Sequence, residues 1–138
     1  MPHTVARWRG EKLTCETRAQ SGPHRAVDEP PMFGDAEAMR PTEMLLGALG
    51  GCTGINAVLL LKKFRQPFKS LDVEVEGDQE KEWPHAFTEI RINFKIGWDG
   101  KHDKQLVENA LDMAVNKYCP VDATLSTGTK IKHKRSDA

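Results

Sequence analysis

The residues of this sequence best suited to do chemistry are its three cysteines, Cys15, Cys52 and Cys119. A cysteine thiolate is a nucleophile that oxidises readily, and two thiols can form and break a disulfide. The alternative is that each cysteine is a small buried side chain, because free cysteines are among the most buried residues. An odd number of cysteines does not fit a secreted disulfide framework. We therefore expect free thiols in a reducing compartment.

Cys52 lies in the segment LGGCTG, within a long apolar run. Gly50 and Gly51 leave no side-chain bulk immediately before the cysteine. Thr53 and Asn56 are polar in these otherwise apolar surroundings. Two interpretations remain open at this point: the segment opens a path to the sulfur, or its small residues allow close helix packing.

Cys119 lies at the end of a predicted helix, directly before Pro120. Proline disfavours helical geometry at the preceding residue, so this thiol is expected at a chain break that presents its side chain well. We expect Pro120 to open one more helical turn. The competing interpretation is that Cys119 is a core residue at the end of an apolar stripe. Cys15 falls in a predicted strand, and we interpret it as structural.

Composition and residue spacing disfavour several other chemistries. The 20 basic and 20 acidic residues cancel, so no net field is available to attract nucleic acid. The cysteines show no CxxC spacing and the five histidines are scattered, which disfavours a metal site. No phosphate-binding loop, dinucleotide fingerprint or hydrolase elbow is present. The basic C-terminal segment with Lys130, Lys132 and Lys134 indicates a solvated strand edge. We expect no cofactor, no metal and no nucleic-acid partner.

The elements that position the thiols begin with two short strands over Val5–Thr17, turning near Gly10. Residues 20–40 are rich in proline and glycine, which predicts a long loop with a short strand near His24–Val27. A helix is then predicted from Pro41 to about Phe64, because proline suits the first helical position.

The middle of this helix is uncharged from Met44 to Leu61, a length at which a membrane span becomes a candidate. Its glycines and polar residues make it only modestly hydrophobic, and its amphipathic neighbours need a shared core. We therefore predict a helix that is buried on all sides, whose glycines allow another element to approach closely. Met1–Val5 contains no apolar signal core, so we expect a cytoplasmic protein with no membrane partner.

Two strands with alternating polarity follow, and their pattern predicts an antiparallel hairpin with one solvated face. Their inward-facing residues are Leu71, Val73 and Val75, then Ile90, Ile92, Phe94 and Ile96. A second helix with one apolar stripe is predicted over Asp103–Tyr118, and a final strand over Thr129–Arg135. This order predicts a single α+β domain over residues 1–138, with both helices packed on an antiparallel sheet.

Two segments resemble the two cysteine motifs of the OsmC/Ohr family. The run PTEMLLGALGGCT, from Pro41 to Thr53, is similar to the helix that carries the family's first cysteine. The run KYCPV, from Lys117 to Val121, is similar to its second-cysteine motif. The pair of motifs is specific, whereas either alone would be a weak signal. The resemblance extends from about Val5 to Arg135, and the LGGCT form is closest to the OsmC-like branch.

The resemblance implies an α+β fold with antiparallel sheets around two central helices, in an intertwined homodimer that exchanges strands. It also implies a thiol peroxidase of oxidative or osmotic stress defence. Cys52 would attack an organic hydroperoxide or H2O2, Cys119 would resolve the sulfenic acid as a disulfide, and a dithiol reductant would restore both thiols. An apolar substrate pocket would be lined by Leu45 and Leu49, with Trp8 and Phe33 as further candidates.

Family members also place an arginine from the N-terminal strands beside the first thiol, held by a glutamate. Arg9 is our candidate for this arginine, with Arg7 and Arg25 as rivals. Glu43 is the candidate glutamate, but peroxidase members carry theirs directly after the proline, where this chain has Thr42. A shift of one position turns a helical side chain by about 100°. Glu43 would otherwise be an acidic residue that complements the helix N-terminus.

This departure supports an alternative function. The chain would then be a non-catalytic dimeric protein that keeps the fold and both thiols, and binds a small apolar or thiol-reactive ligand.

Overall fold

A computed structural model describes residues 1–10, 12–29, 34 and 38–138 of the chain. These residues divide into two compact units, Met1–Leu45 and Leu46–Ala138. A single domain over residues 1–138 stays a prediction, and Phe33, a candidate pocket residue, lies outside the described residues.

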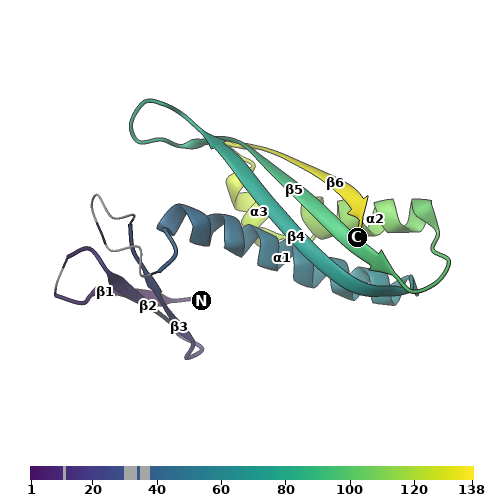
Figure 1. Ribbon diagram of the computed structural model, residues 1–138, viewed down its shortest axis with the longest axis horizontal. Coiled ribbons are helices and arrows are strands. Elements are labelled where there is room, and N and C mark those ends of the chain that lie inside the picture. Colours follow the sequence, from purple (N-terminus) through teal and green to yellow (C-terminus); the bar gives the residue numbers. More distant parts are fainter. Residues whose placement is uncertain (11, 30–33, 35–37) are drawn as a thin grey trace. The chain divides into compact units, whose positions relative to one another are not determined.

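The N-terminal unit contains three short antiparallel strands, β1 (Thr4–Trp8), β2 (Cys15–Ala19) and β3 (His24–Val27), in the order β1-β2-β3 (Figure 1). The connection between β1 and β2 passes through Gly10, whose φ of +93° carries no steric penalty for glycine. All three strands lie where the sequence predicts them.

α1 (Pro41–Lys63) has the ends that its sequence predicts. Pro41 occupies the first helical position, and a Glu43 carboxylate oxygen accepts a 2.9 Å hydrogen bond from the N–H of Arg40, just outside the helix. After the last turn, Arg65 adopts the left-handed conformation at φ 58°, so that the following N–H groups turn back to the final carbonyls.

The C-terminal unit contains a second sheet in the order β4-β5-β6, formed by β4 (Phe68–Gln79), β5 (Phe87–Trp98) and β6 (Lys130–Asp137). β4 and β5 form the predicted antiparallel hairpin. The expectation of a wholly antiparallel sheet is wrong for the final strand, because β6 pairs with β5 in parallel. Parallel neighbours need a long crossover connection, and here two helices supply it.

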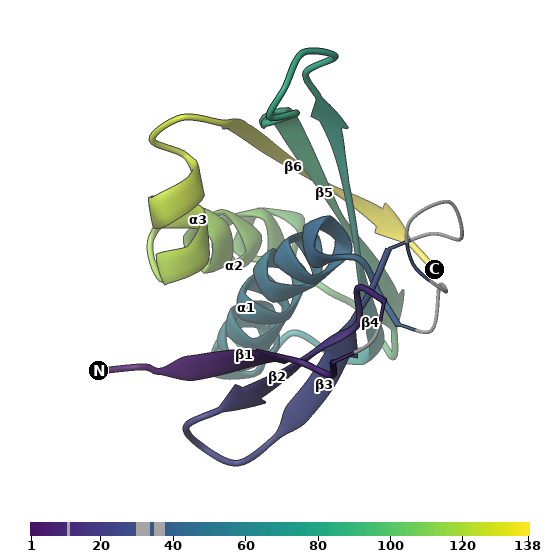
Figure 2. The ribbon, with the colours of Figure 1, turned by 90° about the vertical axis from the view of Figure 1, so that its left-hand side faces the viewer.

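Those helices are α2 (Lys104–Asn116) and α3 (Pro120–Leu125). The Asp103 carboxylate caps α2 by accepting hydrogen bonds from the first turn. Figure 2 shows α1 and α2 on the same face of the β4-β5-β6 sheet. The core between these layers is formed by Leu49, Ala57, Leu60, Leu61, Ile90, Ile92, Phe94, Ile96, Val107, Ala110, Leu111, Ala114 and Val115. The inward face of β5 is therefore as predicted. The apolar stripe of α2 is buried as predicted except at its ends, where Leu106 and Tyr118 are exposed.

α1 differs from the prediction that it is buried on all sides. Its side chains are buried on one face only, while Ile55 is 65% exposed and Leu59 is 62% exposed. The physical reason is that one sheet and one helix cover a single side of it. α1 is long and apolar enough to cross a membrane. The core helices of globular proteins can have the same length and composition, and a third of the apolar stretch of α1 is buried within the chain.

The glycines of α1 divide between its two faces. A Cβ on Gly50 would lie 3.1 Å from a methyl group of Val75, and one on Gly54 would lie 3.2 Å from a methyl group of Val73. These two glycines allow the helix to approach β4 closely, as predicted. A Cβ on Gly47 or Gly51 would meet no atom of the described residues within 4 Å.

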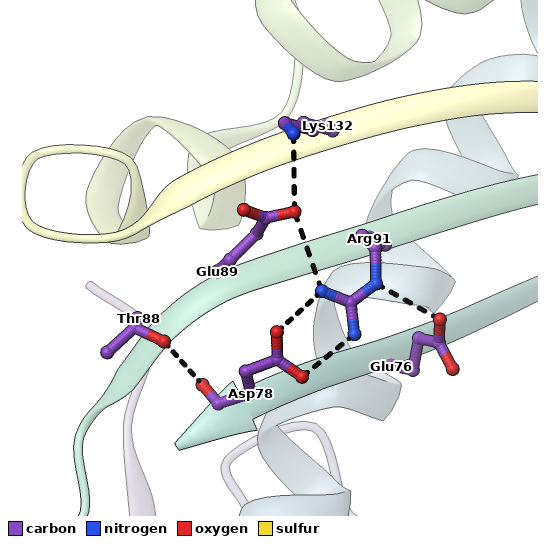
Figure 3. Close-up of polar contacts among 6 residues, drawn as sticks. All are labelled: Glu76, Asp78, Thr88, Glu89, Arg91 and Lys132. Carbon is purple, nitrogen blue, oxygen red and sulfur yellow. Dashed lines mark hydrogen bonds and ion pairs between the residues drawn. The ribbon is translucent and has the colours of Figure 1, made fainter. Parts of the chain in front are cut away.

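The outer face of the sheet carries an ion-pair network centred on Arg91, shown in Figure 3. The Arg91 guanidinium donates two hydrogen bonds to Asp78, at 2.9 and 3.0 Å, and one to Glu76 at 3.1 Å. Glu89 lies 3.5 Å from the same guanidinium and 3.4 Å from Lys132 on β6. Arg91 therefore connects the acidic residues of β4 and β5. Its hydrogen bonds and charge hold the pKa of Asp78 below its ordinary value.

We expect Arg91→Met to lower the free energy of unfolding at pH 7. Because the pKa of Asp78 is lower in the folded chain, its contribution is fully present above about pH 4, the unfolded value. The contribution disappears as the pH falls through the folded value. Urea unfolding at pH 7 and at about pH 2.5 should therefore show the wild type and the variant converging in acid. Lys130→Met, an exposed change on β6, is the control. An equal difference at both pH values would contradict the expectation.

Candidate active site

The two predicted reactive cysteines meet in the folded chain. Cys52 lies in the middle of α1, Cys119 lies between α2 and α3, and their Sγ atoms are 2.8 Å apart. Both are free thiols, and the S–H of Cys119 is directed at the sulfur of Cys52. The fold thus brings together two residues that are 67 positions apart in sequence.

Cys119 is held by the start of α3. Its extended backbone (φ −92°, ψ 107°) makes it the N-cap residue, and Pro120 opens the helix, as predicted. The Cys119 sulfur accepts a 3.3 Å hydrogen bond from the N–H of Asp122. Cys119 lies between two helices and is buried, with 3% exposure. The two interpretations of this residue, a presented thiol and a core residue, are therefore both correct in part.

Burial favours the neutral form of Cys119. Removal from water, together with the hydrogen bond to Cys52, raises the pKa of Cys119 to about 11, and the N–H of Asp122 offsets part of this rise. At neutral pH Cys119 is therefore a protonated thiol that donates to Cys52. The pair is asymmetric, with Cys52 half-buried and Cys119 buried.

The polar residues after Cys52 support the packing interpretation of that segment. Thr53 is fully buried, and its hydroxyl donates to the Leu49 carbonyl of the preceding turn at 2.9 Å. The Asn56 amide donates to the Ala114 carbonyl of α2 at 3.2 Å. These side chains therefore satisfy helix carbonyls and join α1 to α2.

The predicted tuning residues lie in the N-terminal unit. Glu43 accepts from the Arg40 N–H, as expected of an acidic residue at a helix N-terminus. The guanidinium of Arg9, just after β1, lies 3.9 Å from a carboxylate oxygen of Glu16. Arg25, one of its rivals, donates to the His24 carbonyl at 2.7 Å. Roles for Glu43 and Arg9 beside Cys52 stay predictions.

The predicted pocket residues have different surroundings. Leu49 has no exposed surface and belongs to the core, whereas Leu45 is partly exposed on the first turns of α1. Trp8 is exposed, and its indole N–H donates to the Lys12 carbonyl at 3.0 Å. A substrate contact by Leu45 or Leu49 stays a prediction.

Asp122 is a candidate residue that sequence reasoning missed. It lies in the first turn of α3, three residues after Cys119, and only 5% of it is exposed. Burial raises the pKa of its carboxyl group above the ordinary value, although the charge of His133 opposes this rise. An acidic residue in a first helical turn is ordinarily exposed, so the segment CPVD gave no signal of burial.

Metal ligands do not cluster in the described part of the chain. Among those residues, no group of three histidine, cysteine or acidic side chains is arranged to hold a metal ion.

Comparison with known proteins gives the same family as the motifs. The sequence model of the family described as "OsmC-like protein" matches residues 34–134. Protein YhfA of Escherichia coli K12 is 34% identical over 97 residues, which cover 70% of this chain and 72% of YhfA.

Two solved structures extend the likeness in fold to the whole chain. An OsmC-like protein from Mycoplasma pneumoniae has a TM-score of 0.84 at 17% identity, and the match covers 100% of this chain and 97% of that one. An organic hydroperoxide resistance protein from Legionella pneumophila has a TM-score of 0.73 at 12% identity, covering 99% and 96%. The family match and the paired cysteine motifs agree, and the chain belongs to the OsmC-like protein family.

Proposed function

We propose that this protein is a thiol-dependent peroxidase that reduces organic hydroperoxides or H2O2 through Cys52 and Cys119, in oxidative or osmotic stress defence. The observation that carries the proposal is the 2.8 Å separation of the two sulfurs. The name of the Legionella pneumophila relative, an organic hydroperoxide resistance protein, supports the substrate class.

The asymmetry of the pair supports the roles that we propose for the two cysteines. Cys52 is the acceptor of the thiol–thiol hydrogen bond and is the less buried of the two, so it attacks the peroxide. Attack on the terminal oxygen breaks the O–O bond, gives Cys52 sulfenic acid and releases the alcohol after protonation. Cys119 then attacks the sulfenic sulfur, which forms the disulfide and releases water. A dithiol reductant returns both residues to thiols.

The proposal is tested by rapid mixing of pre-reduced protein with H2O2 and, in parallel, with cumene hydroperoxide. Mass spectrometry would follow the loss of two hydrogens and locate the disulfide. We expect saturable oxidation that forms a Cys52–Cys119 bond and is lost in Cys52→Ser.

Cys15→Ser is the matched control, because Cys15 is also a free thiol but lies in β2 of the N-terminal unit. We expect it to oxidise at the wild-type rate. Oxidation of the wild type no faster than that of a small free thiol, without an internal disulfide, would overturn the enzymatic function.

We also propose that the protein is an intertwined homodimer, in which α1 packs against its copy. Gly47, Gly51, Ile55 and Leu59 recur every four residues and form one stripe, which we call the α1 stripe. In the described part of the chain, no atom would lie within 4 Å of a Cβ on either glycine, and the two apolar side chains are more than half exposed. A second copy of this helix would fill that space and cover those side chains.

We place this dimer in the cytoplasm. A reducing compartment suits three free thiols. The apolar length of α1 fits a helix that is covered on one face by its own chain and on the other by a partner copy, so no bilayer is needed to explain it.

One observation favours the alternative, a non-catalytic protein that binds a small apolar or thiol-reactive ligand. The Glu43 carboxylate accepts a hydrogen bond from the Arg40 N–H at the start of α1. This bond stabilises the helix end, and it gives Glu43 a role that does not involve an arginine beside Cys52. Slow oxidation of both thiols, combined with saturable binding of an apolar probe that quenches tryptophan fluorescence, would support this second function.

A further inference from the structure

Asp122 is a buried acid whose position the proposed reaction has not yet explained. Its Oδ1 atom is buried and has no hydrogen-bond partner among the residues that the structure describes. An unpartnered buried oxygen is costly and is rare in native proteins. Where such a group persists beside a reactive pair, a role in the chemistry is a physical reason for keeping it.

The first turn of α3 places this acid near the resolving thiol. Cys119 is the N-cap residue and Asp122 is the third helical residue, the two positions whose side chains bond each other's backbone N–H groups in a capping box. Half of that box is present, since the Asp122 N–H donates to the Cys119 sulfur at 3.3 Å. Among the described residues, no N–H group donates the reciprocal bond to Oδ1, which leaves this oxygen available as a proton acceptor.

Titratable groups on three other elements act on the Cys119–Asp122 turn, either directly or through a neighbouring residue. Cys52 on α1 faces Cys119, and His133 on β6 acts electrostatically on the Asp122 carboxyl group. His133 Nε2 in turn lies 3.4 Å from a carboxylate oxygen of Asp112 on α2, at the surface. His133 is thus the charged side chain that acts on the Asp122 carboxyl group, and Asp112 is the carboxylate paired with His133.

The resolving step needs a base because Cys119 is a weak acid. With a pKa of about 11, only about one Cys119 in ten thousand is a thiolate at pH 7. Thiolates, not thiols, attack sulfur, so an unassisted Cys119 would resolve slowly. When resolution is slow, a second peroxide molecule can oxidise the sulfenic acid irreversibly.

We propose that Asp122 accepts the thiol proton of Cys119 during resolution, an inference that rests on the peroxidase function proposed above. As the Cys119 S–H bond breaks, the proton passes to the Asp122 carboxylate and the sulfur forms a bond to the sulfenic sulfur of Cys52. The S–O bond of Cys52 breaks, and the leaving hydroxide takes the proton from Asp122 and departs as water. Asp122 ends as it began, and one thiol and one sulfenic acid have become one disulfide and one water.

Asp122→Asn tests this role, because it keeps the shape of the side chain and removes the proton acceptor. One equivalent of cumene hydroperoxide would be mixed with reduced protein between pH 6 and pH 9. Dimedone trapping would follow the Cys52 sulfenic acid, and mass spectrometry the disulfide. We expect sulfenic acid to form at the wild-type rate, and the disulfide to form at least about tenfold more slowly at pH 7. In the variant, disulfide formation should accelerate by about tenfold per pH unit, while the wild type changes much less.

Two further variants separate this role from a structural one. Asp122→Glu, which restores a carboxylate, should recover the shallow pH profile, and Asp137→Asn, an exposed change on β6, should behave as the wild type. A uniform slowing of Asp122→Asn at every pH, or an unchanged rate, would overturn the inference while leaving the peroxidase intact. Failure of the wild type to form sulfenic acid at all would instead overturn the proposed function.

Discussion

Replacing Cys119 with serine should abolish peroxide turnover with a dithiol reductant. The first step, oxidation of Cys52 to the sulfenic acid, should remain. The first step uses only the Cys52 sulfur and the peroxide, so its rate should stay within about threefold of the wild-type rate. Resolution requires the second sulfur, so peroxide turnover measured by dithiol consumption should fall by at least about 100-fold. With excess peroxide, mass spectrometry should show Cys52 gaining two and then three oxygens.

Serine is the matched replacement because Cys119 also caps α3. A serine hydroxyl accepts the Asp122 N–H at least as well as sulfur does, so Cys119→Ser should fold normally. Cys119→Ala would lose that cap, at a cost of about 1 kcal/mol in the free energy of unfolding. Comparison of the two variants therefore separates the loss of the resolving thiol from the loss of folding stability. Full turnover by Cys119→Ser would mean that the dithiol itself resolves the sulfenic acid.

An aspartate in place of Leu59 should convert the proposed dimer into a monomer. Leu59 is exposed in the single chain and belongs to the α1 stripe. Burying a leucine side chain contributes about 1.5–3 kcal/mol, and symmetry doubles this because each protomer supplies one. A buried aspartate adds a desolvation cost at both positions. The dissociation constant should rise by at least about 100-fold, as measured by sedimentation velocity over a concentration series.

Trp83→Asp is the control for that experiment. Trp83 is a large apolar side chain with 85% exposure that lies in the connection between β4 and β5 and is not part of the α1 stripe. This variant tests whether a new surface charge elsewhere also dissociates the dimer. A wild type that sediments as a 15.5 kDa monomer at micromolar concentrations would contradict the dimer directly. If Leu59→Asp remained dimeric, another surface would have to form the interface.

The elements with one buried face were predictable from the sequence. The period of two in β4 and β5 and the apolar stripe of α2 arise because a half-buried element must alternate. The helix boundaries were also visible, in Pro41 at one end of α1 and in Pro120 after Cys119. These signals are local, so they can be read without knowing the rest of the fold.

Features that depend on contacts between distant parts of the sequence could not be predicted from local patterns. The parallel direction of β6 depends on the crossover through α2 and α3, which leaves no mark on the strand itself. The apolar length of α1 could not distinguish burial within one chain from burial between two. Proximity of Cys52 and Cys119 followed from a family resemblance alone, since nothing local encodes a distance across 67 positions. Burial of Asp122 likewise depends on packing rather than on residue type.

The hydrogen bond from Asn56 to the Ala114 carbonyl also bears on kinetics. Asn56 lies one turn beyond Cys52, and Ala114 lies in the last turn of α2, shortly before Cys119. The bond fixes the axial alignment of the two helices next to the thiols, so each sulfur meets the other at a high effective molarity. In the proposed reaction, disulfide closure within one chain would then be a first-order process, independent of how much protein the cell contains. It would compete with a second peroxide only through the peroxide concentration.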